Sequence, residues 1–336
     1  MRLERAFRDF IEFHEIDNQS QYTVRNYRRY VGSFVEWLKT EHEVTSTDDL
    51  RVAHLRGWIS HLQKRMNRDG RELKDSTVRI WGVHVLAFCH WLESEKIVEQ
   101  DITSRFKLPR VEQEYIPTFT PEEVERLFEA CEDSSIGVTP SVQKALTARN
   151  RAILAVLIDA GLRRSELLGL RLCDVDREMR LLIVHRKGNK WQQVPISRDG
   201  FRYLHEYLSK HRKSLAAKAG RDVARKDDAV FLSRRGGAIT VHTLNQLFDR
   251  LQERTGIEGK RVSPHNCRRY MATTQLAMGR SPLDVQRQMG HTTLRMTNHY
   301  ASLTVEHIQK SHEQYSPLRS KPSVGTETIG MGYWDE

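Results

Sequence analysis

Residues 181–196, Leu-Leu-Ile-Val-His-Arg-Lys-Gly-Asn-Lys-Trp-Gln-Gln-Val-Pro-Ile, decide the fold of the second half of the chain. Leu181–Val184 and Gln193–Ile196 are short runs with branched apolar residues, which favours two β-strands. The segment between them, Arg186–Lys190, is polar and contains Asn and Gly, as a hairpin turn requires. The sequence therefore predicts a small antiparallel sheet.

Helical patterns flank this sheet on both sides. Apolar residues there recur at three- and four-residue steps, which places them on one face of a helix. One helix has a well-defined start, because Ser263 can cap its first turn and Pro264 suits the first helical position. Helices are expected over Asn150–Ile158 and Arg164–Leu170, and from about Arg198, Thr240 and Pro264 onward.

The apolar periodicity lapses over residues 108–119, where prolines stand at 109 and 117. Such a segment is typical of an extended linker. A helix then restarts, because Thr120 and Glu123 can form a capping box around Pro121. The expected organisation is a domain over 1–107, a linker over 108–119, a second domain over 120–314 and a tail over 315–336.

The first hundred residues indicate a small bundle of helices. One helix is expected over Ser20–Glu41, and Asp69-Gly70 separates two further amphipathic segments. The aromatic residues of these segments stand at core spacing, so we expect them to pack against one another rather than to stack on bases. The apolar faces carry Tyr27, Val31, Phe34 and Leu38; Leu55, Trp58, Ile59 and Leu62; and Val78, Trp81, Val85, Phe88 and Leu92.

The composition limits the classes of protein. With 336 residues, 38% of them hydrophobic and 29% charged, the chain can form two folded domains. Its net charge of +10 is typical either of a protein with a polyanionic partner, most often nucleic acid, or of a solvated basic surface without a partner. The cysteines are scattered singly, which excludes a zinc motif or a disulfide framework. We find neither an apolar run near the ~20 residues that cross a bilayer nor a signal sequence, so no membrane association and a cytoplasmic location are expected.

Attack on a phosphodiester needs a nucleophile, positive charge beside the non-bridging oxygens and a proton for the leaving oxygen. No carboxylates have the spacing of hard-metal ligands, so arginine forks would have to supply the charge. Arg163 stands at an expected helix start, and Glu166, three residues later, can hold its guanidinium. His265 and Arg268 share a face of the helix that starts at Pro264, near amides that favour phosphate.

Further along the chain, Tyr300 follows Gly290-His291 by nine residues. Each short pattern is weak alone, but their order is specific. Gly-Leu-Arg-x-Ser-Glu at 161–166, Lys-Gly-x-Lys at 187–190, His-x-x-Arg at 265–268, Gly290-His291 and Tyr300 together resemble the active-site series of the tyrosine recombinase (phage integrase) family.

The resemblance implies a mainly α fold with a small antiparallel β-sheet. The N-terminal helices are similar to the family's core-binding, DNA-binding domain, and residues 120–314 to its α/β catalytic domain. Few residues precede Ser20, so the chain resembles the two-domain members that have no additional arm-binding domain.

The resemblance also implies roles for the matched residues. Tyr300 would attack the phosphorus and form a 3′-phosphotyrosyl bond, which frees a 5′-hydroxyl. Arg163 and Arg268 would clamp the scissile phosphate, and Glu166 would support the clamp. Because the phosphotyrosine conserves the free energy of the phosphodiester, neither ATP nor a metal or other cofactor is expected.

Proton transfer is implied for three further residues. Lys187 would protonate the leaving oxygen. His265 and His291 would bind the phosphate and assist proton transfer to or from the tyrosine, whose ordinary pKa of about 10 makes it a poor nucleophile unaided. Arg269 stands where the family commonly has a histidine. Contacts to DNA are expected from Arg25, Arg28, Lys190 and Arg269.

The implied partners are double-stranded DNA with specific recombination sites, further copies of the chain in a homo-tetramer, and accessory DNA-bending factors in some reactions. A C-terminal helix over Val305–Gln314 would dock on a neighbouring copy. Two alternatives stay open. A type IB topoisomerase shares this chemistry but only relaxes supercoils, and a non-catalytic DNA-binding regulator would hold phosphates without cleaving them.

Overall fold

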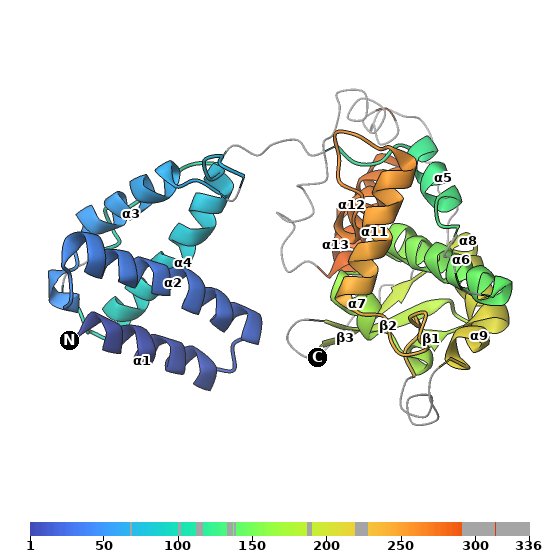
Figure 1. Ribbon diagram of the computed structural model, residues 1–336, viewed down its shortest axis with the longest axis horizontal. Coiled ribbons are helices and arrows are strands. Elements are labelled where there is room, and N and C mark those ends of the chain that lie inside the picture. The colour runs from blue at the N-terminus through green and yellow to red at the C-terminus, as the bar shows by residue number, and fades with distance from the viewer. Residues whose placement is uncertain are drawn as a thin grey trace, which may run out of the picture. The chain divides into compact units, whose positions relative to one another are not determined.

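The computed structural model describes residues 1–67, 69–99, 102–111, 117–132, 137, 139–186, 190–218, 228–290 and 313. The chain divides into two compact units, Met1–Tyr115 and Ile116–Glu336. Figure 1 draws the helices of the first unit in blue to teal and the elements of the second in green to orange. The division falls within the segment that the sequence indicates as a linker.

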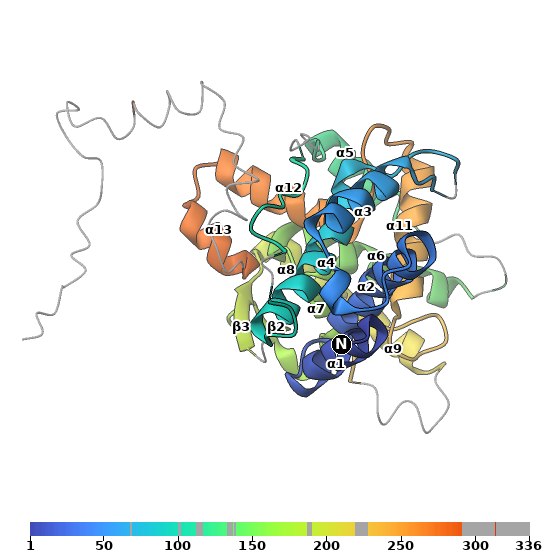
Figure 2. The same cartoon turned by 90° about the vertical axis from the view of Figure 1, so that its left-hand side faces the viewer.

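The first unit is helical, as the apolar spacing predicts (Figures 1 and 2). Phe10, Phe34, Trp58 and Phe88 are buried in its core, and the ring centroids of Phe10 and Phe88 lie 5.2 Å apart in an edge-to-face contact. The aromatic residues therefore serve packing, as expected. The helices are α1 (Leu3–Ile16), which the sequence analysis did not delimit, α2 (Gln21–His42), α3 (Val52–Lys64) and α4 (Asp75–Ser94), with a 3₁₀ turn at Thr47–Asp49.

The second unit combines helices with one small sheet. Its first helix begins with the predicted capping box: the Thr120 amide donates to Glu123 Oε2 over 2.8 Å, and the Glu123 amide donates to Thr120 Oγ1 over 3.3 Å. The helices are α5 (Pro121–Glu129), α6 (Pro140–Ala155), α7 (Arg164–Gly169), α8 (Arg198–Glu206), α9 (Arg212–Ala216), α11 (Val241–Thr255), α12 (Pro264–Ala277) and α13 (Pro282–Met289), with π-helical turns at Val156–Ala160 and Tyr207–His211.

The sheet has the antiparallel strand order β1-β2-β3, formed by Val175–Asp176, Leu181–Arg186 and Lys190–Pro195. Side chains alternate between its faces, so Leu182, Val184 and Arg186 of β2 all point to the buried side. Leu182 and Val184 join the apolar core of the unit. A charged side chain thus follows two apolar ones into the interior.

Several sequence-based boundaries require correction. The helix expected over Asn150–Ile158 starts earlier, at Pro140, and its last turn widens into the π-helical turn that ends at Ala160. The hairpin turn is shorter than expected, because Arg186 and Lys190 pair with each other in the ladder. Local composition underestimated both strands, since a polar residue can extend a strand wherever its neighbour across the ladder supplies hydrogen bonds.

Several expectations fall outside the described residues. These are the positions of Lys187, His291 and Tyr300, the tail over 315–336, and all of the helix expected over Val305–Gln314 except Glu313.

Candidate active site

The N-terminus of α7 holds the first candidate residue, Arg163. Gly161 ends the preceding helical segment with φ of 67°, a conformation that favours glycine. The chain is then extended at Arg163, whose backbone amide donates to Glu166 Oε2 and whose Nη1 donates to Glu166 Oε1, each over 2.8 Å. The predicted contact between these two side chains is therefore present. Glu166 is 5% exposed, which makes this carboxylate an internal anchor.

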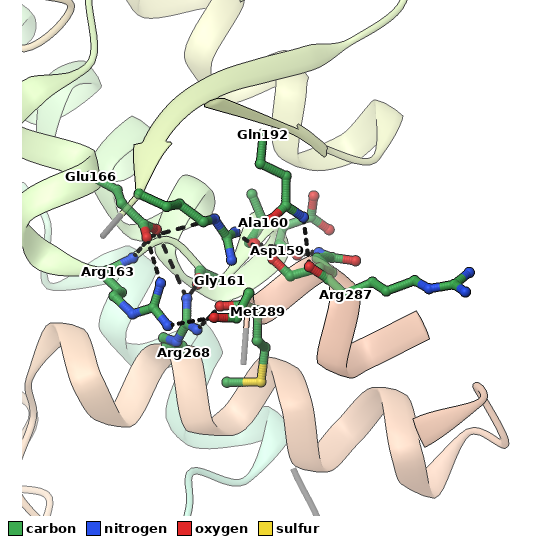
Figure 3. A network of polar contacts seen from close by, with 12 residues as sticks. Asp159, Ala160, Gly161, Arg163, Glu166, Gln192, Arg268, Arg287 and Met289 are labelled. Atoms are coloured by element: carbon green, nitrogen blue, oxygen red, sulfur yellow. Dashed lines mark hydrogen bonds and ion pairs between the residues drawn. The ribbon is translucent and has the colours of Figure 1, made fainter. Parts of the chain in front are cut away.

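The second candidate arginine comes from α12. The predicted cap is present, because the Asn266 amide donates to Ser263 Oγ over 3.2 Å. Arg268, one turn into the helix, is 4% exposed and donates to the carbonyl oxygens of Gly161 and Met289. Its Nη1 lies 4.0 Å from Glu166 Oε2. Figure 3 shows the side chains of Arg163, Glu166 and Arg268 directed toward one another.

A third arginine, which the sequence analysis missed, completes the cluster. Arg186 ends β2 and is 7% exposed. Its Nε lies 3.8 Å from Glu166 Oε1, and its Nη2 donates to the carbonyl oxygen of Gln288 over 2.6 Å. The strand alternation of buried positions at 182 and 184 was the signal that could have found it, had the strand been extended past Val184.

The three guanidinium groups converge on the C-terminal end of α13. Arg186 donates to the carbonyl oxygen of Gln288, Arg268 to that of Met289, and Arg163 to that of Gly290 over 3.0 Å. The last carbonyls of a helix have no partner within the helix and carry partial negative charge. Guanidinium donors therefore satisfy this helix end, and the end in turn orients the guanidinium groups.

The electrostatic balance of the cluster favours an anion. Three guanidinium groups surround one carboxylate, so the net charge is +2. Burial lowers the pKa of Arg186, Glu166 raises it and Arg163 lowers it again, and a guanidinium stays protonated at neutral pH. The side chain of Arg163 is 36% exposed. Arg163, Glu166 and Arg186 also line a cavity of about 960 Å³, through which a ligand can approach.

The other predicted site residues that the structure describes lie on several elements. His265 is exposed in the first turn of α12, and Lys190 is exposed at the start of β3. Arg25 is exposed on α2. Arg28 forms an ion pair with Glu15 over 2.6 Å.

Arg269, by contrast, is 6% exposed. This burial gives no support to a direct DNA contact, and the assignment stays a prediction. Tyr270, the next residue, is half-buried and lies 6.4 Å from Phe119 between ring centroids, which is a packing position.

Neither a metal site nor a membrane-spanning helix is found among the described residues. No group of three or more His, Cys, Asp or Glu side chains there is placed to hold a metal ion. Within the same residues, every helix is too short or too polar to span a bilayer.

Comparisons with known families cover both units of the chain. The phage integrase family model matches residues 117–307, and the model of the phage integrase N-terminal SAM-like domain matches residues 7–96. Tyrosine recombinase XerC of Anoxybacillus flavithermus is 31% identical over 317 residues, which cover 93% of this chain and 96% of that protein. Tyrosine recombinase XerD of Yersinia pestis is 29% identical over 300 residues, which cover 89% and 93%.

Among solved structures, the Tn1549 transposon integrase in complex with transposon right end DNA is similar with a TM-score of 0.70. That match has 19% identity and covers 94% of this chain and 99% of the other, so it establishes the mainly α fold with its small sheet. The two family models and the relatives establish more than the fold. The chain belongs to the phage integrase family of tyrosine recombinases.

Proposed function

We propose that this tyrosine recombinase cuts and rejoins DNA at specific sites through a covalent 3′-phosphotyrosine on Tyr300. The observation that carries the proposal is the arginine cluster, in which Arg163 and Arg268 meet on the carboxylate of Glu166. A phosphodiester carries one negative charge, and the pentavalent transition state of its cleavage carries about two. A preorganised site of net charge +2 is complementary to that transition state.

Each bond change has a residue assigned to it. The Tyr300 oxygen attacks phosphorus and the bond from phosphorus to the 5′-oxygen breaks. The tyrosine proton passes to His265 or His291, and the 5′-oxygen takes a proton from the Lys187 ammonium. Arg163 and Arg268 hold the non-bridging oxygens. Reversal of these steps by a different 5′-hydroxyl joins new ends.

The solved relatives support DNA as the partner. The Tn1549 integrase was solved in complex with transposon right end DNA, and a lambda integrase dimer was solved bound to a core site. We propose double-stranded DNA with specific sites for this chain as well, in a tetramer that brings two sites together. Its net charge of +10 favours binding to such a polyanion.

Capture of the covalent intermediate tests the proposal. Nicked suicide substrates should trap the wild-type protein as a DNA adduct that resists denaturant, in buffer with EDTA. Tyr300→Phe should bind the site with unchanged affinity and form no adduct, whereas Tyr270→Phe, the matched control, should still form it. An adduct with Tyr300→Phe would show that another residue is the nucleophile. A strict magnesium requirement would contradict the metal-free mechanism.

The same assay separates the alternatives. A DNA-binding regulator would bind with strong salt dependence and give no adduct even in the wild type. A type IB topoisomerase would give an adduct and relaxed plasmid, but no exchanged products from a plasmid with two sites. We expect exchanged products.

The role of Lys187 has its own test. Lys187→Ala should cleave ordinary DNA much more slowly than the wild type. Its defect should be small on DNA with a 5′-bridging sulfur, because a thiolate leaves without a proton. An equal defect on both substrates would remove Lys187 from this role.

A further inference from the structure

Arg186 is an unusual residue to find in the core of this unit. It follows Leu182 and Val184 on the inward face of β2, where an apolar side chain would extend the core. A buried charge is costly unless it is paired and hydrogen-bonded. Its Nε and Nη1 are buried and have no hydrogen-bond partner among the described residues. An ordinary structural arginine would use these donors.

Within the part of the chain that the structure describes, a side-chain hydrogen bond joins Arg186 to the end of α13. Its Nη2 donates to the Gln288 carbonyl oxygen over 2.6 Å. The following carbonyls, those of Met289 and Gly290, accept from Arg268 and Arg163. Arg186 therefore contacts the same helix end that orients both predicted clamp residues.

Arg186 also packs directly on Gly290. A Cβ atom at position 290 would clash with Arg186 Nη1, and φ at Gly290 is 59°. Glycine is thus required there both by backbone conformation and by the approach of the guanidinium. This contact holds the C-terminal end of α13 against the end of β2.

Repulsion among the three guanidinium groups also constrains their positions. Arg163, Arg186 and Arg268 all lie within 4.0 Å of Glu166, and the guanidinium groups repel one another. Each group is therefore held where attraction to the carboxylate and to a carbonyl balances repulsion by the other two. Removal of Arg186 would let Arg163 and Arg268 shift toward the space that it leaves.

We propose that Arg186 is a positioning residue, which fixes the end of α13 and thereby the two clamp guanidinium groups of Arg163 and Arg268. The proposal rests on the proposed function, because it assigns Arg186 an effect on cleavage through that clamp. In this role Arg186 acts through Arg163 and Arg268 rather than on the reacting atoms.

The first test measures single-turnover cleavage and site affinity separately. Arg186→Met removes the charge and the donors at similar volume. It should slow cleavage by roughly 100-fold, the effect of a misplacement near 1 Å, with site affinity unchanged. Arg186→Lys keeps the charge and one donor and should recover part of the loss. Cleavage at the wild-type rate by Arg186→Met would overturn the proposal.

A coupling experiment shows whether Arg186 acts through the clamp. In a background of Arg163→Ala, the further change Arg186→Met should slow cleavage only a few-fold, because residues that act as a unit are non-additive. A purely structural role would give the full 100-fold loss in both backgrounds and would contradict the proposal. Cleavage at the wild-type rate by Arg163→Ala alone would instead contradict the proposed function, because Arg163 would then not bind the scissile phosphate.

A matched pair of glycine variants supplies a test that keeps Arg186. Gly290→Ala places a methyl group on the guanidinium, whereas Gly256→Ala, at the end of α11, has the same φ of 59° with nothing within 4 Å. Gly290→Ala should slow cleavage about as much as Arg186→Met, and Gly256→Ala should leave the rate unchanged. If Arg186→Met does not fold, the two glycine variants test the proposal without it. Equal cleavage rates for Gly290→Ala and Gly256→Ala would refute the proposal.

Discussion

The two units place their charges in opposite ways. In the first unit the ion pair of Arg28 and Glu15 is half exposed, and the core is made of aromatic and aliphatic side chains. Among the described residues, all buried charged side chains lie in the second unit, where Arg186 and Arg268 surround Glu166. Buried ion pairs are a poor way to stabilise a fold, because desolvation offsets their attraction. The contrast supports the proposal that the buried charges around Glu166 serve a ligand.

The largest expected effect is on chemistry in the second unit. Arg268→Ala removes one preorganised donor from the proposed phosphate site, so single-turnover cleavage should fall by about 10³-fold. Site affinity, measured by gel shift, should change far less, because most of the DNA surface is contacted elsewhere. Unchanged cleavage would mean that the cluster around Glu166 is not a phosphate site. The buried charges of the second unit would then have no role in catalysis to set them apart from the exposed charges of the first.

The next largest effect is expected on the free energy of unfolding when the carboxylate of Glu166 is neutralised. Glu166→Gln leaves three guanidinium groups without a counter-charge, which should lower the free energy of unfolding by about 3 kcal/mol. Glu15→Gln, which neutralises the exposed carboxylate of the first unit, should cost less than about 1 kcal/mol. Urea unfolding of the full chain measures both. Equal losses would show that burial does not distinguish the two pairs.

The first unit should respond to acid through its histidines. Burial lowers the pKa of His14 and of His61, which stack on Tyr27 and Trp58. Their pKa in the unfolded chain is near 6.5. Below that pH the unfolded state binds more protons, so the free energy of unfolding should fall as pH drops from about 7 toward 5.

Tryptophan fluorescence can follow this loss, because Trp37, Trp58, Trp81 and Trp91 all belong to the first unit. His61→Gln should flatten the pH dependence. A free energy of unfolding that does not change with pH in the wild type would mean that these rings are fully hydrated in the folded unit.

The smallest effect is expected for a surface cation. Arg28→Ala breaks an exposed ion pair, so stability should change by less than about 1 kcal/mol. If Arg28 contacts DNA, the variant should bind all sequences several-fold more weakly, and the salt dependence of log Kd should become shallower by about one unit. An unchanged salt dependence would leave Arg28 as a partner of Glu15 alone.

Sequence patterns predicted the parts of the site that depend on local spacing. Arg163 and Glu166 meet because they stand three residues apart at a helix start, and the Ser263 cap placed Arg268 one turn into α12. The helical bundle of the first unit likewise followed from apolar periodicity, a local signal.

Contacts between distant segments were beyond such reasoning. Arg186 reaches the cluster from a strand and meets Gln288 a hundred residues later along the chain, so no spacing rule connects them. The burial of Arg269 has the same origin, since tertiary packing rather than residue type buries both arginines of α12.

Replacement of the scissile phosphate tests the central claim most directly, namely that the clustered guanidinium groups neutralise that phosphate. Single-turnover cleavage by the wild type and by Arg163→Ala would be measured on ordinary DNA and on DNA with a neutral methylphosphonate at the scissile position. We expect the variant to be about 10³-fold slower on the phosphodiester and nearly as fast as the wild type on the methylphosphonate. A defect of the same size on both substrates would contradict the claim.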